Sequence, residues 1–253
     1  MSDQKINIAF IGTGLMGLPM VQNLSKGNYQ INAFNRTPSK MDSLKEASNI
    51  KICDSLEQAI KNSSIVITML PDDEAVEKVV NEVIGKSLLS KDSIFVDMSS
   101  TKYESAKLFY SNLKKTNVHF VDAPVSGGPE GAKSATLAIM AGGDADTFEK
   151  IKNILKTMGN PTLVGPSGSG QVAKLCNQII VGVTIGAVAE AVILCEQVGA
   201  NPENFIKAVA GGFADSKILQ NHGARMIKKD FAPRGKSITH LKDMDNILKC
   251  AKD

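Results

Sequence analysis

Short apolar runs alternate with amphipathic stretches through residue 166 of the chain. Apolar runs bounded by polar or glycine-rich residues predict strands buried on both faces of a sheet, and they occupy residues 5–12, 30–34, 51–53, 65–70, 94–98, 118–121, 137–140 and 162–164. The stretches between them predict helices at 19–24, 39–47, 56–61, 73–89, 104–115 and 145–158. Strands that alternate with helices predict an α/β fold, a mostly parallel Rossmann-type sheet with helices on both faces.

A long apolar stretch from Gly168 to Gly199 departs from this pattern. No proline interrupts it and glycines mark both ends, so it predicts one helix of about 28 residues, or ~42 Å at 1.5 Å per residue. Only helical patterns follow Gly199, at 202–210, 216–227 and 238–251. We therefore predict two domains: a sheet domain over 1–166 and an all-α domain over 167–253 that begins with this long interdomain helix.

A membrane span is an alternative interpretation of the long apolar stretch. Its most apolar segment, 179–189, is followed by Glu190 and is shorter than the ~20 residues that a span needs. Gly182 and Gly186 would let a second helix approach closely. We therefore expect no membrane partner, and a helix that crosses a domain or subunit interface in a homo-oligomer, either a dimer or a tetramer.

Composition narrows the functional classes. The net charge is +3 and no Lys/Arg-rich block occurs, so no nucleic-acid partner is expected. The four cysteines have no CxxC or CxxH spacing and only three histidines are present, so we expect neither a metal site nor a disulfide framework. The polar start MSDQK is unlike a signal peptide. These features fit a cytoplasmic protein.

The first predicted strand leads directly into the glycine-rich segment GTGLMG, and a helical pattern follows. This order of strand, GxGxxG and helix is typical of dinucleotide binding. The first glycine permits a tight turn, the second lets a pyrophosphate approach the backbone, and the third lets helix and strand pack closely. The candidate cofactor-binding residues in this segment are Gly12, Thr13, Gly14, Leu15, Met16 and Gly17.

The end of the second predicted strand indicates which dinucleotide binds. An NAD site usually has Asp or Glu here to hold the ribose 2′-hydroxyl, whereas this chain has Asn35, Arg36 and Thr37. Arg36 can pair with a 2′-phosphate, and Thr37 can add a hydroxyl donor. These residues favour NADP(H) over NAD(H). The alternative is that Arg36 stacks on the adenine or lies in solvent.

Ligands of such sheets bind beyond the carboxyl ends of the strands, which points to the loops 69–73, 97–101 and 122–128. The last of these reads DAPVSGG. Ser126, Gly127 and Gly128 offer a hydroxyl and uncovered backbone N–H groups that can form an anion-binding nest for a carboxylate; an ordinary turn is the alternative. Lys174, near the start of the long helix, is by itself better explained as a solvated surface charge.

Four motifs, FIGTGLMGLPMVQNL, DAPVSGG, GSGQVAKLCNQ and HLKDM, follow one another in the order typical of the β-hydroxyacid dehydrogenases, and the chain resembles that family from Ile8 to about Leu248. The resemblance implies a catalytic Lys174 and a substrate carboxylate held by the DAPVSGG loop, with Asn177 or Gln178 orienting the substrate. It also implies cofactor contacts from Met69, Leu70, Pro71, Ser100, Phe231 and Lys242.

Three departures from the family pattern stand out. Ser100 and Tyr103 replace a threonine and a proline after the fifth strand, and the Ser100 hydroxyl keeps the implied cofactor contact. Gln178 stands where the family often has Asn, so the orienting role is open between Asn177 and Gln178. Family chains also run further at the carboxyl end, so the helical domain is expected to be shortened.

The implied reaction is hydride transfer between NADP(H) and a small β-hydroxy acid or semialdehyde, with Lys174 as general acid and base. We expect a tartronate semialdehyde (2-hydroxy-3-oxopropionate) reductase or a 3-hydroxyisobutyrate dehydrogenase-like enzyme. The alternatives among enzymes are a glyoxylate/succinic semialdehyde reductase and an imine reductase. Outside enzymes, the alternative is a non-catalytic NADP-binding module.

Overall fold

The computed structural model describes residues 5–232 and 237–251 and divides into two compact units, Met1–Lys174 and Leu175–Asp253. The division falls inside the long helix after its first six residues, whereas the boundary predicted from sequence is 166/167. Residues 1–4, on which the expectation about a signal peptide rests, lie outside the described residues, as do the last two of the chain.

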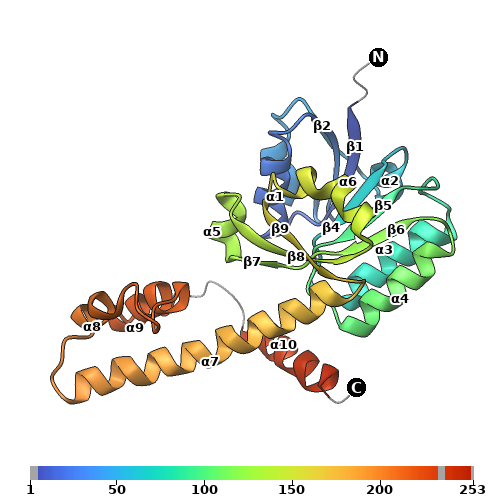
Figure 1. The fold of residues 1–253 in the computed structure, drawn as a ribbon. Coiled ribbons are helices and arrows are strands. Elements are labelled where there is room, and N and C mark those ends of the chain that lie inside the picture. Colours follow the sequence, from blue (N-terminus) through green and yellow to red (C-terminus); the bar gives the residue numbers. More distant parts are fainter. Residues whose placement is uncertain (1–4, 233–236, 252–253) are drawn as a thin grey trace. The chain divides into compact units, whose positions relative to one another are not determined.

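Unit 1 is built on a mostly parallel sheet (Figure 1), which confirms the predicted α/β fold. Its strand order is β3-β2-β1-β4-β5-β6-β8-β7, and β9 pairs with β8. The ladder from β3 to β6 is parallel, whereas β8 runs antiparallel to β6 and β7 and parallel to β9. The strands are β1 (Ile6–Ile11), β2 (Tyr29–Phe34), β3 (Ile50–Ile52), β4 (Ile65–Thr68), β5 (Ile94–Asp97), β6 (His119–Asp122), β7 (Val125–Ser126), β8 (Leu137–Gly143) and β9 (Gly159–Gly165).

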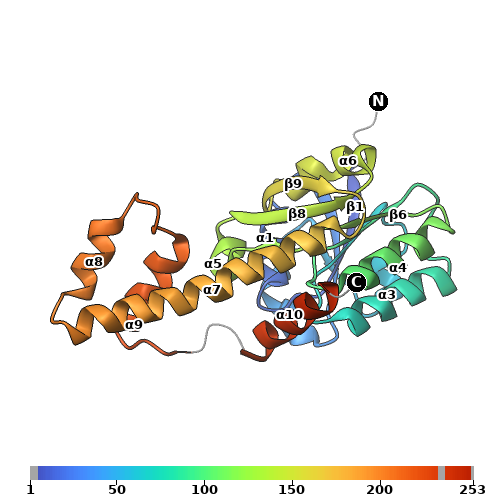
Figure 2. The same cartoon turned by 60° about the horizontal axis from the view of Figure 1, so that its bottom comes forward.

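Helices cover both faces of this sheet. The first cluster of buried side chains lies under α1, η1, α5 and α6, and the second lies under α2, α3 and α4; α3 and α4 run side by side in Figure 2. These elements are α1 (Gly17–Leu24), the 3₁₀ helix η1 (Pro38–Leu44), α2 (Leu56–Ile60), α3 (Asp73–Gly85), α4 (Tyr103–Lys114), α5 (Gly128–Lys133) and α6 (Ala145–Leu155). The long helix α7 (Ser169–Gln197) follows them.

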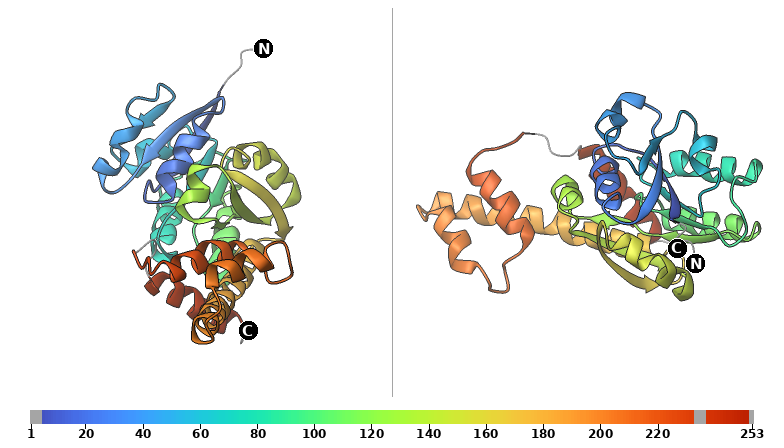
Figure 3. Two further views of the ribbon diagram at one scale, coloured as in Figure 1. Left: turned by 90° about the vertical axis from the view of Figure 1, so that its left-hand side faces the viewer. Right: turned by 90° about the horizontal axis from the view of Figure 1, so that it is seen from above.

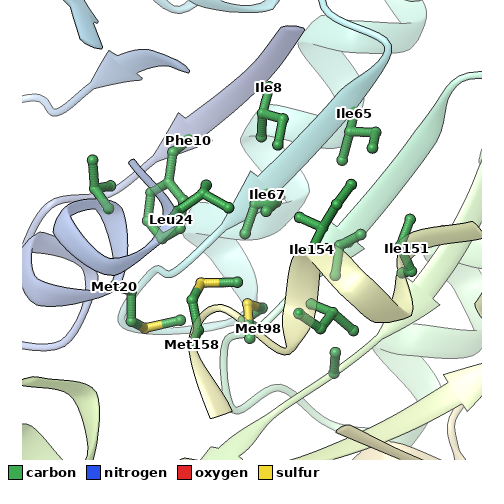
Figure 4. Close-up of a cluster of buried hydrophobic side chains, with 14 of the residues drawn as sticks. Ile8, Phe10, Met20, Leu24, Ile65, Ile67, Met98, Ile151, Ile154 and Met158 are labelled. Carbon is green, nitrogen blue, oxygen red and sulfur yellow. The ribbon is translucent and has the colours of Figure 1, made fainter. Parts of the chain in front are cut away.

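The central strand β1 shows why the apolar runs are unbroken. Ile8 and Phe10 point into the first cluster, and Ala9 and Ile11 point into the second, because successive side chains of a strand face opposite sides of the sheet. Figure 4 shows Ile8 and Phe10 with their neighbours in the first cluster. Burying one such large side chain contributes about 1.5–3 kcal/mol, so both faces of β1 contribute to the stability of unit 1.

Three local features of unit 1 differ from the prediction. The segment predicted as a helix at 39–47 is instead η1, whose backbone bonds link residues three apart, as from Lys40 N to Thr37 O (3.2 Å). Strand β7 was not predicted because it has only two residues. Helix α5 was not predicted because its sequence GPEGAK combines two glycines with a proline, all poor helix formers.

Unit 2 contains the rest of α7, α8 (Pro202–Val209), the π-helical turn η2 (Leu219–Gly223), α9 (Ala224–Ile227) and α10 (Ser237–Cys250). Val188 and Val192 of α7 form a small core with Ile206 and Leu219. Figure 3 shows α8 and α9 beside the carboxyl-terminal half of α7. The single helix predicted at 216–227 is therefore divided between η2 and α9.

Helix α7 is long and apolar enough to cross a membrane by length and composition alone, and 11% of its most apolar 18-residue window is buried. The apolar segment 179–189, considered alone, was too short to predict a span. One helix of this kind is weak evidence for a span, because the core helix of a soluble protein can have the same length and composition. The packing of Val188 and Val192 shows that part of its apolar surface is covered by protein.

Candidate active site

The glycine-rich turn after β1 has the tight geometry predicted for it. Gly12 has a φ of +102°, and its N–H donates to the carbonyl of Phe34 (2.9 Å). A Cβ at Gly12 would collide with the carbonyl of Met69, and a Cβ at Gly17 would collide with the carbonyl of Gly12. The turn therefore packs directly under the loop that follows β4, and α1 begins against the turn.

The same turn is open where a dinucleotide would approach. A Cβ built on Gly14 has no neighbour within 4 Å, and within the described part of the chain the buried hydroxyl of Thr13 has no hydrogen-bond partner. Among the described residues, the half-buried N-cap residue Met16 makes no side-chain capping bond at the amino end of α1, and Leu15 before it is exposed. Backbone N–H groups and the positive dipole at a helix amino end suit phosphate oxygens, so these residues fit a dinucleotide.

Asn35 fixes the end of β2. Its Oδ1 accepts a hydrogen bond from the N–H of Thr13 (3.0 Å), and its Nδ2 donates to the carbonyl of Thr37 (2.9 Å). Arg36 and Thr37 are exposed, and the sequence has no carboxylate from Asn35 until Asp42. The edge of the candidate cofactor site therefore has an accessible cation where an NAD site has an acid.

The loops after β4 and β5 lie together beside the glycine turn. Met69 donates its N–H to the carbonyl of Ile11 (2.9 Å), and Leu70 donates its N–H to the Oγ of Ser99 (2.9 Å). Pro71 is exposed and Ser100 is half-buried. The residues predicted from these two loops therefore line the same end of the sheet as the glycine turn.

The predicted carboxylate loop joins β7 to α5. Ser126 ends β7, Gly127 precedes α5, and Gly128 begins it. Gly127 and Gly128 have φ angles of +138° and +63°, which glycine adopts readily and other residues rarely do. The turn that presents these N–H groups therefore requires glycine.

Lys174 lies against this loop. Its Nζ donates to the carbonyl of Val125 at 2.9 Å, and the side chain is half-buried. Val125 immediately precedes Ser126, so the ammonium group lies beside the residues predicted to bind the carboxylate. The structure thus brings together Lys174 and the predicted carboxylate loop, which lie far apart in the sequence.

A buried carboxylate lies behind these loops at the end of β5. The Oδ1 of Asp97 accepts from Thr68 Oγ1 (2.8 Å) and from the N–H of Ser99 (3.0 Å), and Oδ2 accepts from Thr101 Oγ1 (3.4 Å). Burial raises the pKa of Asp97 from 3.8 to about 6, against the opposing effect of these hydrogen bonds.

A second buried carboxylate, Asp122, ends β6. It accepts from the N–H groups of Gly168 (2.7 Å) and Gln171 (3.0 Å) at the start of α7, and burial raises its pKa from 3.8 to about 6. Asp97, Asp122 and Gln171 were not predicted from sequence as residues that build the site. The available signal was that adjacent buried apolar strands each end in an aspartate, where a solvated charge is not expected.

Tyr103, the departure from the family proline, lies at the start of α4 next to this region. A Cβ at Gly168 would approach its ring to 2.7 Å, and Lys107 lies 5.2 Å from the ring centroid. The tyrosine therefore covers the backbone of Gly168, whose N–H binds Asp122.

The remaining predicted site residues lie in unit 2 and are described within it. Asn177 Nδ2 donates to Gln178 Oε1 (2.8 Å), and Gln178 Nε2 donates to Asp243 Oδ2 of α10 (2.7 Å). Lys242 is half-buried on α10, and Phe231 is exposed before it. In unit 2 the two amides therefore connect α7 to α10, and their orienting role toward a substrate stays a prediction.

The described residues contain no group of three or more His, Cys, Asp or Glu that could hold a metal ion. Cys53, Cys176 and Cys195 are free thiols.

A parallel sheet that ends in a glycine-rich turn open to phosphates, followed by a long helix that presents one lysine to a glycine loop, defines a dinucleotide-dependent oxidoreductase. Comparison with known families agrees. Residues 7–182 match the NAD binding domain of 6-phosphogluconate dehydrogenase, and residues 168–253 match the NAD-binding domain of NADP-dependent 3-hydroxyisobutyrate dehydrogenase. The chain belongs to the β-hydroxyacid dehydrogenase family of NAD(P)-dependent oxidoreductases.

Individual relatives cover nearly the whole chain. It is 39% identical over 249 residues to the 2-hydroxy-3-oxopropionate reductase of Escherichia coli (strain K12), covering 98% of this chain and 85% of the relative. It is 34% identical to the probable 3-hydroxyisobutyrate dehydrogenase-like 1, mitochondrial, of Arabidopsis thaliana, covering 94% and 71%. The solved structure of Mycobacterium tuberculosis 3-hydroxyisobutyrate dehydrogenase with L-serine superposes with a TM-score of 0.87 at 27% identity, covering 98% and 87%.

Proposed function

We propose that this protein is an NADP(H)-dependent reductase of a small semialdehyde carboxylate, of the tartronate semialdehyde (2-hydroxy-3-oxopropionate) type. The observation that carries the proposal is the contact of Lys174 Nζ with the carbonyl of Val125, beside Ser126, Gly127 and Gly128. The identity with a 2-hydroxy-3-oxopropionate reductase over 98% of the chain supports the substrate class.

In this proposal each group has one task. Ser126 and the N–H groups of the glycine turn hold the substrate carboxylate, so that the carbonyl lies near Lys174. The bound nicotinamide supplies the hydride in reduction and accepts it in oxidation. Lys174 donates a proton to the oxygen as negative charge forms there, and removes that proton in the reverse direction. The carbonyl of Val125 orients the ammonium group without neutralising it.

The direct test replaces the lysine. Lys174→Ala should bind NADPH normally but lower kcat about 10²–10⁴-fold, the usual contribution of general acid–base catalysis, measured as NADPH absorbance with tartronate semialdehyde. Lys133→Ala, which removes an exposed lysine from the end of α5, is the control and should leave kcat unchanged. Near-normal turnover of Lys174→Ala would overturn the assignment.

Substrate choice is tested with a panel that includes 3-hydroxyisobutyrate, succinic semialdehyde and glyoxylate. The proposal expects the highest kcat/KM with tartronate semialdehyde. A 3-hydroxyisobutyrate dehydrogenase would prefer the first compound of the panel, and a glyoxylate/succinic semialdehyde reductase would prefer the other two. A non-catalytic NADP-binding module would bind NADPH and turn over none of them.

We also propose that NADP(H) is preferred over NAD(H), which the exposed Arg36 supports. A charge-assisted hydrogen bond to the 2′-phosphate is worth about 1.5–3 kcal/mol, so Arg36→Ala should lower kcat/KM for NADPH about 10–100-fold. The value for NADH should not change, and it serves as the internal control. Equal losses with both cofactors, or an unmodified enzyme that prefers NADH, would contradict this preference.

We infer further that the protein is a homo-oligomer, a dimer or tetramer assembled through α7, and that α7 does not cross a membrane. The exposed apolar side chains on α7 support this: Ile180 is 65%, Val183 70% and Leu194 61% exposed, and exposed apolar surface of this kind marks interaction sites. A second copy could cover them without a membrane. The free thiols of Cys53, Cys176 and Cys195 fit a reducing cytoplasmic location.

Light scattering tests the assembly against the 27.0 kDa of one chain. The unmodified protein should have two or four times this mass without detergent, and Val183→Glu should reduce it to one chain because a buried charge is costly. Leu108→Glu, at a side chain of unit 1 that is 52% exposed, is the control and should not change the mass. A monomer, or a requirement for detergent or lipid vesicles, would contradict the proposal.

A further inference from the structure

Buried hydrogen bonds join the loops after β4, β5 and β6 at the first turn of α7. Gln171, which is fully buried, accepts from the N–H of Thr101 through Oε1 (3.1 Å) and donates from Nε2 to the carbonyl of Ser99 (2.9 Å). Ser99 in turn accepts from the N–H of Leu70. One amide side chain therefore connects the helix that bears Lys174 to the two loops predicted to contact the cofactor.

Asp122 holds the same turn from the third loop. The first N–H groups of a helix have no partner inside it, and here Gly168 donates to Oδ1 and Gln171 to Oδ2 of this one carboxylate. The fit is tight: a Cβ on Gly142 would lie 2.6 Å from the N of Gly170 and 2.8 Å from Asp122 Oδ1. Helix α7 can therefore begin in only one position relative to the end of β6.

Lys174 follows Gln171 by three residues, about 4.5 Å along the axis. Its Nζ contacts the carbonyl of Val125, three residues after Asp122. The segment from Asp122 to Val125 thus contacts α7 at two points, the backbone at the start of the helix and the ammonium group one turn later. A displacement of the helix start would move the ammonium group relative to the carboxylate loop.

We propose that Asp122 and Gln171 are positioning residues for the reaction, which set where Lys174 lies relative to the carboxylate loop and the cofactor loops. This inference rests on the proposed catalytic role of Lys174. Both side chains are fully buried and each makes two hydrogen bonds inside unit 1, so they act through Lys174 rather than on the substrate. Misplacing a reacting group by about 1 Å can lower the rate about 10²-fold.

The test removes the hydrogen bonds of Gln171 while keeping its length. Gln171→Met should lower kcat about 10–100-fold and change KM for the substrate and for NADPH less than about threefold. The matched control is Asn49→Met. Asn49 is also an amide that binds two backbone groups, the carbonyls of Ser25 (2.8 Å) and Tyr29 (3.1 Å), but it precedes β3 at the opposite end of the sheet. The control should lose stability while kcat changes less than twofold.

Gln171→Glu and Asp122→Asn serve as second variants in case Gln171→Met does not fold. Each keeps the shape of the side chain and alters one hydrogen bond, and each should lower kcat more than it changes either KM. Equal kcat in Gln171→Met and Asn49→Met, or losses confined to KM, would overturn the inference. Near-normal turnover of Lys174→Ala would instead overturn the proposed function, so the two failures are distinguishable.

Discussion

The two parts of α7 are held in contrasting ways. In the first turn, within unit 1, Gln171 is fully buried and both ends of its amide are hydrogen-bonded, while Asp122 receives two backbone N–H groups. In the part within unit 2, Val188 and Val192 pack in a small apolar core, and Val183 remains exposed. One continuous helix thus begins in a polar network and continues as an apolar surface.

The two parts of α7 are therefore suited to different tasks: the polar first turn to positioning Lys174, and the apolar part to packing against other protein surfaces. Hydrogen bonds are directional and fix atoms to within a few tenths of an ångström, whereas apolar burial is non-directional and scales with area. The first turn is therefore the part that can hold Lys174 at a defined place beside Val125. The apolar part is suited to covering a large surface of protein, which the proposed assembly would provide.

The largest expected effect on stability comes from substituting Gly170, in the polar first turn of α7. A Cβ there would collide with the carbonyl of Met140 and would lie 2.7 Å from the carbonyl oxygen of Asp122. Because these obstacles are backbone atoms that cannot rotate away, Gly170→Ala should lower the free energy of unfolding by about 3 kcal/mol, the upper end of the usual overpacking cost. Urea unfolding followed by circular dichroism measures this, and a loss below 1 kcal/mol would show that the start of α7 is not held tightly.

The next largest effect is a difference in stability between asparagine variants of the two buried carboxylates, Asp97 and Asp122. Asp97→Asn can keep its hydrogen bonds, since Oδ1 accepts from Thr68 and Ser99 and the new Nδ2 can donate to Thr101. Asp122→Asn cannot, because both of its oxygens face N–H groups of Gly168 and Gln171. Asp122→Asn should therefore be less stable than Asp97→Asn by about 1–3 kcal/mol, the cost of an unsatisfied buried donor. Equal stabilities of the two variants would contradict the network.

Much of this arrangement was predictable from sequence. The unbroken apolar runs of 94–98 and 118–121 correctly predicted buried parallel strands, and the order of strand, GTGLMG and helix correctly predicted the glycine turn between β1 and α1. These features are local, because period and glycine spacing are properties of neighbouring residues.

The polar network could not be predicted in the same way. Gln171 binds Thr101 from 70 positions along the chain, and Asp122 binds Gly168 from 46. Such pairings depend on which strands become neighbours in the sheet, and no pattern within either segment encodes that. The contact of Lys174 with Val125 is of the same kind, which explains why the lysine by itself resembled a surface charge.

The buried carboxylates also predict a pH dependence of stability. Burial raises the pKa of Asp97 from 3.8 to about 6, so between these values the folded chain holds a proton that the unfolded chain has released. The contribution of this group to the free energy of unfolding is therefore largest below pH 3.8 and is lost as pH rises to about 6. At 1.36 kcal/mol per pH unit the loss is at most about 3 kcal/mol.

Asp97→Asn removes this contribution. Relative to the unmodified protein, the variant should gain stability as pH rises from about 4 to about 7, and urea unfolding at both values measures the change. Parallel stability curves for the two proteins would show that the carboxylate ionises as easily in the folded chain as in the unfolded one.

The smallest expected effect on stability comes from substituting glycines in the apolar part of α7. Two glycines there, Gly182 and Gly186, have different surroundings. A Cβ on Gly186 has no neighbour within 4 Å, whereas one on Gly182 would lie 2.9 Å from Nε2 of His240 on α10. Because alanine favours a helix over glycine by about 0.8–1 kcal/mol, Gly186→Ala should raise the free energy of unfolding by nearly that amount. Gly182→Ala should raise it less, because His240 must move. If Gly186→Ala instead lowers stability at protein concentrations where the chain is assembled, but not where it is dissociated, then a second copy packs against Gly186 and the proposed interface includes this position.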